Sequence, residues 1–125
     1  MGDPRHQFGK ESEEIAAKYL KKKGYRILEH NYHTQLGEID IIARDKKTIV
    51  FVEVKARRSY RFGDPKEAVT PKKQRTISMV ALSYLKKAGL EQASARFDVV
   101  TVSAHSPTEQ PEIEIVKNAF ELAYG

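Results

Sequence analysis

The sequence predicts an α/β sandwich, in which helices pack against a mixed central β-sheet. Helical and strand-like apolar patterns follow one another along the 125 residues in the order helix, strands, helix, strands. With 40% hydrophobic and 31% charged residues, the chain can bury one core but hardly two. We therefore expect a single domain over residues 1–125, with its core at about 9–120 and a flexible segment at 1–8.

The first half of the chain predicts one helix and a β-hairpin. Residues 11–23 are acidic at the start, basic at the end and followed by Gly24, which suits a helix and its dipole. Three strand-like apolar runs follow, at residues 25–28, 39–43 and 48–54. The polar break Asp45-Lys46-Lys47 between the last two runs has the size of a hairpin turn.

The second half predicts another helix and further strands. Thr70 can cap a helix that begins at Pro71, and apolar residues recur at helical spacing until Lys86 and Lys87, which precede Gly89. The remaining apolar segments are a strand at 97–102, a strand at 113–116 and a short C-terminal segment at 118–123.

Two carboxylates and a lysine stand out when the hairpin strands are phased. Successive side chains alternate along a strand, so Glu53 and Lys55 share one face of the second strand. If Lys46-Lys47 form a two-residue turn, Asp40 lies directly opposite Glu53, with β-carbons roughly 5 Å apart. Like charges so close repel, so a structural design would avoid the pair or place a cation between them.

The same alternation divides the first hairpin strand into two faces. Glu38, Asp40 and Ile42 are expected on one face, and Ile39 and Ile41 on the other. A slip of one residue in the register would move Asp40 away from Glu53, so the candidate site depends on this phasing.

Convergent carboxylates are the ligands that Mg²⁺ or Mn²⁺ prefers, with waters left for a substrate phosphate. Such an ion polarises a phosphodiester and lowers the pKa of a bound water. Lys55 could orient or activate that water, or stabilise negative charge on the phosphate. The spacing of Asp40, Glu53 and Lys55 is also compatible with an ordinary strand whose outer face meets water.

Side chains from both helices can reach the same region. Glu13 lies at the border of the apolar stripe of the first helix, while Glu14 points toward water. Glu13 could be a third metal ligand, or a first-turn acid that complements the helix dipole. In the second helix, Lys73 and Gln74 lie one turn before the buried Ile77, near a helix N-terminus that favours phosphate.

The net charge of +5 is concentrated in residues 55–75, which hold eight basic side chains against two acidic ones. This basic segment predicts a contact with a polyanion such as DNA, although a solvated loop has the same composition. Tyr60 and Phe62 could contact a sugar or base. The predicted nucleic-acid contacts are Arg57, Arg58, Arg61, Lys66, Lys72, Lys73, Gln74 and Arg75.

Composition excludes several other classes of protein. The chain has no cysteine, so disulfides and thiolate metal sites are excluded. No run approaches the ~18 apolar residues of a membrane span, and the first twelve residues lack the apolar core of a signal peptide. We therefore expect a cytoplasmic protein without a membrane partner.

Several ordered motifs carry a resemblance to a known family. The motifs are SEEIAAKYLKKKGYRIL, NYHTQLGEIDIIARD, IVFVEVKARR, FGDPKEAV, KKQR, RFDVVTV and KNAF. Over about residues 9–120 the chain resembles the YraN family of small bacterial proteins. That family is similar to the restriction-endonuclease-like nucleases, among them the archaeal Holliday-junction resolvases.

The resemblance implies a fold and a set of roles. It implies a restriction-endonuclease-like sandwich, with Asp40 and Glu53 as metal ligands, Lys55 as the catalytic cation, and Glu13 as the glutamate of the first helix. The family pattern has Gly before that glutamate, where this chain has Ser12.

The sequence thus predicts a Mg²⁺- or Mn²⁺-dependent endonuclease acting on DNA, with branched or junction DNA as a substrate. Two alternatives remain open at this stage. One is a nucleic-acid-binding module that keeps the nuclease fold without cutting, and the other is a scaffold that binds an acidic protein. A homodimer is also open, because two symmetric cuts in a junction need two sites.

Overall fold

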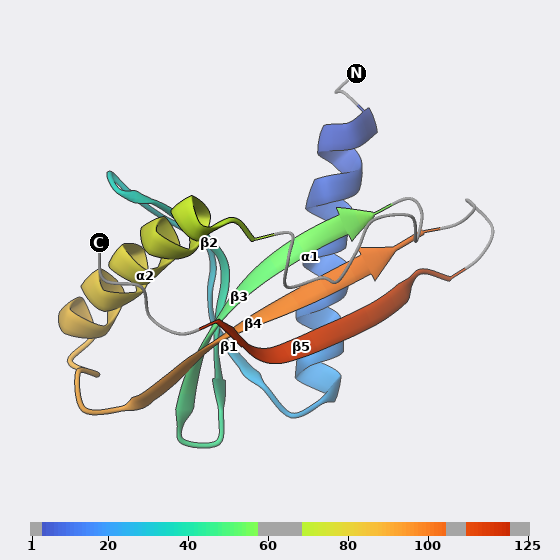
Figure 1. Ribbon diagram of the computed structural model, residues 1–125. Helices are drawn as coiled ribbons and strands as arrows, with labels where there is room; N and C mark the ends of the chain where they lie inside the picture. The colour runs from blue at the N-terminus through green and yellow to red at the C-terminus, as the bar shows by residue number, and fades with distance from the viewer. Residues whose placement is uncertain (1–3, 58–68, 105–109, 121–125) are drawn as a thin grey trace.

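The computed structural model describes residues 4–57, 69–104 and 110–120, with side chains described from residue 10 onward. A five-stranded mixed sheet lies between two helices, one on each face (Figure 1). The elements are α1 (Pro4–Lys22), β1 (Arg26–Thr34), β2 (Gly37–Asp45), β3 (Thr48–Arg57), α2 (Pro71–Lys87), β4 (Ser94–Ser103) and β5 (Glu112–Phe120). The predicted α/β sandwich with a mixed sheet is confirmed.

The strands lie in sequence order, β1-β2-β3-β4-β5. Only β3 and β4 are parallel, while each of the other neighbouring pairs is antiparallel. Parallel neighbours need a crossover connection, and here α2 is part of it, packed on one face of the sheet. The first turn of α2 is thereby brought close to β3.

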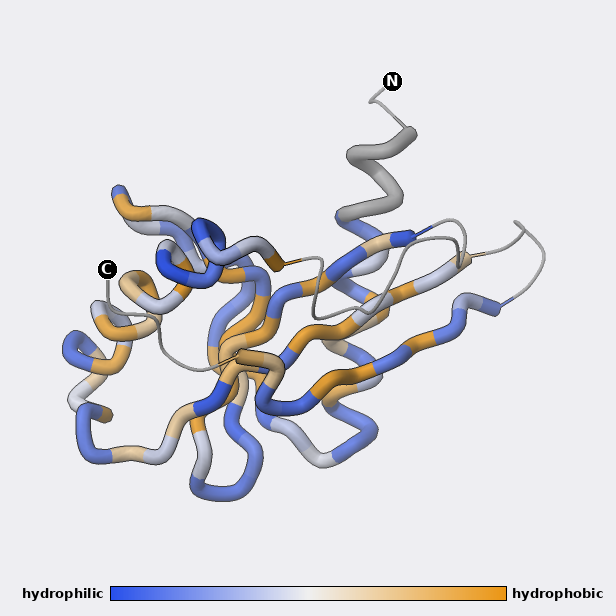
Figure 2. The backbone as a smooth tube through the Cα atoms, viewed as in Figure 1, coloured by the Kyte–Doolittle hydropathy of each residue, from blue (hydrophilic) through white to orange (hydrophobic). Residues whose placement is uncertain are grey.

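Alternation along β3 divides the core into two clusters. Val50 and Val52 pack with Leu20 of α1, whereas Ile49 and Phe51 pack with α2. Figure 2 shows hydrophobic stretches along the strands in the middle of the molecule, while the turn between β2 and β3 is hydrophilic. In the part of the chain that the structure describes, neither helix is long and apolar enough to cross a membrane.

Helix α1 and all five strands extend beyond their predicted bounds. Helix α1 begins at Pro4 rather than at residue 11, and β1 continues to Thr34. Strand β5 runs through Asn118, where the sequence predicted a break between a strand and a terminal segment. Asn118 has a positive φ of 54°, and its backbone N–H donates to Oδ1 of Asp98 at 2.9 Å. This hydrogen bond keeps Asn118 within β5 despite its irregular backbone conformation.

Candidate functional site

The hairpin of β2 and β3 has the register predicted from its turn. Asp45 pairs with Thr48 across Lys46-Lys47, and the pairing continues to Ile41 and Val52. Lys46 has the positive φ of 57° that a tight turn allows. Glu53 and Lys55 therefore follow Phe51 on the face that α2 covers.

Asp40 departs from the regular ladder. Its Oδ2 accepts a hydrogen bond from the backbone N–H of Val54 at 2.8 Å, so a side chain takes the place of a backbone acceptor. The expected pairing of Asp40 directly opposite Glu53 is replaced by this contact, because the paired segment ends at Ile41 and Val52. Asp40 thus lies where the two strands separate.

Because the two strands separate, the start of β2 does not have the alternation of faces that was predicted for it. Ile39 was expected on the face of Ile41, but it packs in the cluster with Ile42 and α2. Gly37 approaches α2 so closely that an added β-carbon would lie 2.6 Å from the Cγ2 atom of Thr76. The start of β2 turns toward α2, and Figure 1 shows the β1–β2 hairpin tip beside this helix while β3 continues away.

Glu53 is the buried acid of the site and has two cations beside it. Its side chain is only 6% exposed. The Nζ atom of Lys73 contacts Oε1 of Glu53, and the Nζ atom of Lys55 lies 3.8 Å from the same oxygen. Lys73 of α2 is therefore the cation that offsets the repulsion between Asp40 and Glu53.

The N-terminus of α2 positions Lys73. Oγ1 of Thr70 accepts a hydrogen bond from the backbone N–H of Lys73 at 3.2 Å, and Pro71 occupies the first turn, as predicted. The side-chain amide of Gln74 donates to the carbonyl oxygen of Val69 at 2.8 Å. Gln74 thus ties the start of the helix to the preceding chain.

Glu13 reaches the site from the opposite helix. It forms a side-chain hydrogen bond with Asp40, whereas Glu14 is exposed. Burial raises the pKa of Glu13, and the charges of Glu38 and Glu53 raise it further.

The acids and one lysine of the site have pKa values that disfavour their charged forms. Burial raises the pKa of Asp40 to about 6, and Glu13 adds to this effect against the opposing Val54 N–H. Burial and the charge of Asp40 raise the pKa of Glu53. Burial and the charge of Lys73 lower the pKa of Lys55. Strong perturbation of several neighbouring groups is typical of functional sites.

The donor chemistry of this site fits a hydrated divalent cation. Mg²⁺ in proteins is commonly held by one or two carboxylates and several waters. Asp40 and Glu53 are two such carboxylates. Among the described residues, no group of three or more His, Cys, Asp or Glu side chains is gathered to hold a metal. Glu13 lies beside Asp40, and its role as a third metal ligand or water-mediated partner stays a prediction.

The predicted DNA contacts are distributed around the site. Lys72 and Arg75 are exposed on the first turns of α2, and Arg57 is half-buried at the end of β3. Arg58, Arg61 and Lys66 lie outside the described residues, as do Tyr60 and Phe62.

Two buried hydroxyls near the site were missed by sequence reasoning. Thr101 of β4 pairs with Lys55 of β3, is 2% exposed, and its Oγ1 has no hydrogen-bond partner among the described residues. Ser12, beside Glu13, is fully buried with an equally unpartnered hydroxyl. Strand alternation could have indicated the face of Thr101. Its position beside Lys55 depends on the parallel pairing of β3 with β4, which the sequence did not predict.

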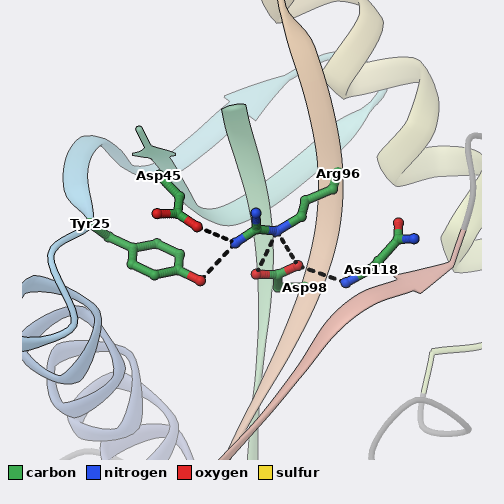
Figure 3. Close-up of polar contacts among 5 residues, drawn as sticks. All are labelled: Tyr25, Asp45, Arg96, Asp98 and Asn118. Atoms are coloured by element: carbon green, nitrogen blue, oxygen red, sulfur yellow. Dashed lines mark hydrogen bonds and ion pairs between the residues drawn. The ribbon is translucent and has the colours of Figure 1, made fainter. Parts of the chain in front are cut away.

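A second polar cluster, the Arg96 network, joins the other end of the sheet. Arg96 donates to Asp98, to Asp45 at 2.9 Å and to the hydroxyl of Tyr25 at 2.7 Å (Figure 3). Asp98 is fully buried and also accepts from Asn118. The network links β4 to the β2–β3 turn, to the start of β1 and to β5.

Together these elements define an α/β protein of the restriction-endonuclease-like class, with a carboxylate–lysine site on one face of the sheet. The sequence profile of the Uncharacterised protein family UPF0102 matches residues 12–102. The chain belongs to this family, which confirms the resemblance to the YraN proteins.

Relatives from several bacteria match almost the whole chain. A UPF0102 protein of Syntrophus aciditrophicus is 57% identical over 94% of this chain and 91% of its own length. A UPF0102 protein of Geobacter sulfurreducens is 51% identical, covering 99% of this chain and 98% of its own. A third UPF0102 protein, from Desulfosudis oleivorans, is 48% identical over 97% of this chain and 95% of its own length.

Proposed function

We propose that this protein is a metal-dependent endonuclease that hydrolyses phosphodiester bonds in DNA. The observation that carries the proposal is the buried Glu53 carboxylate, which lies between two lysine ammonium groups and beside Asp40. Oppositely charged groups held together with perturbed pKa values suit the binding of a cation and a phosphate at one point.

Each side chain of the site has a separate role in the proposed hydrolysis. Asp40 and Glu53 would hold Mg²⁺ or Mn²⁺, which polarises the phosphodiester and acidifies a bound water. Lys55 orients the attacking water and stabilises charge on the phosphate, and its lowered pKa eases transfer of a proton. Glu13 holds Asp40 in position through their shared hydrogen bond.

Basic residues around the site supply contacts to the DNA backbone. Arg57, Lys72 and Arg75 lie on the two elements that carry Glu53 and Lys73. Arg58, Arg61 and Lys66 belong to the same basic stretch of sequence. Phosphate contacts of this kind position DNA without reading its sequence. Branched DNA as the substrate is what the resemblance to the Holliday-junction resolvases implies.

A cleavage assay tests the proposal. Labelled duplex, single-stranded and four-way-junction DNA are incubated with the protein in Mg²⁺, Mn²⁺ or EDTA. We expect metal-dependent cleavage that falls at least about 100-fold in Glu53→Gln and Asp40→Asn, because each removes a carboxylate that holds the ion. Glu14→Gln, which alters an exposed carboxylate next to Glu13, is the matched control and should cleave normally.

A binding module without catalysis is the second candidate. The contact between Lys73 and Glu53 favours it, because this ion pair neutralises the buried acid without any metal. A module of this kind would bind DNA equally in metal and in EDTA, cleave none of the three substrates, and be insensitive to Glu53→Gln. An acidic protein partner instead of DNA would give a flat salt response in DNA binding, whereas phosphate contacts weaken steeply with salt.

A further inference from the structure

We propose that Lys73 is an internal counter-cation that a divalent ion displaces from Glu53, and that the displaced ammonium then contacts DNA phosphate. The inference rests on the proposed function only in taking Asp40 and Glu53 as the metal-holding carboxylates. It makes α2 the element through which metal binding and DNA binding influence each other.

Two lysines already compensate the charge of the buried Glu53 without metal. Asp40 and Glu53 carry two negative charges when ionised, and Lys55 and Lys73 carry two positive ones. A buried carboxylate needs such compensation, since an unpaired buried charge costs several kcal/mol. A divalent ion added to this set would face two ammonium groups at close range. One lysine must therefore leave when the ion enters.

Lys73 is the lysine that can leave. Its side chain is 42% exposed, whereas that of Lys55 is 26% exposed. Lys55 belongs to the middle of the sheet, where its strand pairs with β4 at Thr101. Lys73 projects from the first turn of a helix on a flexible four-carbon stem. Rotation of this stem frees Oε1 of Glu53, the oxygen that both lysines approach.

The start of α2 also carries cations that can bind a phosphate together with the released ammonium group of Lys73. Lys72 and Arg75 are exposed on either side of Lys73 in the sequence. A phosphate drawn to these two cations would lie within reach of Lys73 once it has left Glu53. Metal binding thereby adds one cation to the DNA-contacting surface without any movement of the backbone.

Thermodynamic linkage follows from this exchange. If metal releases Lys73 for DNA, metal tightens DNA binding, and DNA tightens metal binding by the same factor. Loss of the Lys73 charge should weaken that coupling. Loss of the neighbouring Lys72 charge should lower DNA affinity with the coupling unchanged.

Calorimetric titration of the DNA-free protein with Mn²⁺ tests the displacement step. The variants are Lys73→Gln, Lys73→Arg and, as the matched control in the same helical turn, Lys72→Gln. We expect Lys73→Gln to bind Mn²⁺ about 10-fold more tightly than the wild type, because no ion pair has to be broken. Lys73→Arg should bind more weakly, because the guanidinium holds a carboxylate with two hydrogen bonds. Lys72→Gln should stay within about 2-fold of the wild type.

Fluorescence anisotropy with a labelled four-way junction, in Ca²⁺ or in EDTA, tests the coupling. We expect Ca²⁺, which also takes oxygen ligands, to tighten DNA binding of the wild type and of Lys72→Gln by a common factor. That factor should be about 5-fold smaller in Lys73→Gln. Equal coupling in Lys73→Gln and Lys72→Gln, or any other order of Mn²⁺ affinity, would overturn the inference.

These measurements separate the inference from the nuclease proposal. Neither depends on cleavage, so a protein that shows the predicted affinities but cuts no DNA keeps the Lys73 exchange and loses the enzymatic role. A wild type that binds neither Mn²⁺ nor Ca²⁺ contradicts both. Circular dichroism of each variant verifies that affinities are compared between folded proteins.

Discussion

Two polar clusters on the same sheet differ in how well their charges are matched. In the Arg96 network, one guanidinium donates to two carboxylates and a hydroxyl (Figure 3). Burial opposes the charge of Arg96, but its hydrogen bonds to Asp98 and Asp45 outweigh burial and raise its pKa. The folded protein therefore stabilises the charged form of this residue.

At the other end of β3, the folded protein disfavours the charged forms of several groups. The pKa values of Asp40, Glu53 and Glu13 are raised, and that of Lys55 is lowered. A cluster of this kind is a poor source of stability and a good place for a cation or a phosphate. The comparison indicates that the Arg96 network maintains the fold, and it supports our proposal that the Asp40–Glu53 site serves function.

The largest expected effect comes from breaking the Arg96 network. Arg96→Met keeps the aliphatic stem but removes the guanidinium, which leaves the fully buried Asp98 without its cation. We expect the free energy of unfolding to fall by about 3 kcal/mol, measured by urea denaturation at pH 7.

Two further variants sharpen that measurement. Arg26→Met alters an exposed arginine on β1 and should change stability by less than about 0.5 kcal/mol. The double variant Arg96→Met/Asp98→Asn should regain part of the loss, because no buried charge remains unpaired. A loss below about 1 kcal/mol in Arg96→Met would mean that the network is not a major source of stability.

The second effect is a pH dependence centred on Asp40. Its folded pKa of about 6 exceeds the ordinary value of 3.8, so between these values the folded state retains a proton that the unfolded state loses. Stability therefore falls as pH rises through this window, by roughly 2–3 kcal/mol from this group. Asp40→Asn cannot titrate, so it should become more stable than the wild type by that amount at pH 7.

Unfolding curves of both proteins at pH 4 and pH 7 measure this difference. At pH 4 it should be only about 0.5 kcal/mol, because Asp40 is protonated in the folded state and only about half ionised in the unfolded state. Glu14→Gln, the exposed control, should follow the wild-type profile at both pH values. A constant difference between Asp40→Asn and the wild type would show that burial does not raise the pKa of Asp40.

The smallest effect concerns the unpartnered hydroxyl of Thr101. Thr101→Val replaces it with a methyl group of similar size, and we expect the free energy of unfolding to rise by about 1 kcal/mol. Thr34 is the matched control, because its hydroxyl donates to the carbonyl of Gly37 and accepts from the N–H of Leu36. Thr34→Val should instead lose about 1 kcal/mol. Destabilisation by Thr101→Val would mean that this hydroxyl does have a partner in the folded protein.

Much of the fold and part of the site could be predicted from local patterns. The hairpin register followed from the two-residue turn, and the start of α2 followed from Thr70 and Pro71. Helical geometry distinguished the half-buried Glu13 from the exposed Glu14. Each of these features depends on residues within a few positions of one another, where strand alternation and helical periodicity apply directly.

The remaining features depend on contacts between distant segments. Ile39 lies on the opposite face from the predicted one, because the start of β2 turns toward α2. Arg96 donates a hydrogen bond to Tyr25, which lies 71 positions away in the sequence. The sequence by itself determined the strand that carries Glu53 and Lys55 on one face. Only the tertiary structure decided that Lys73 neutralises Glu53, because the packing of α2 on the sheet sets which ammonium group reaches that buried carboxylate.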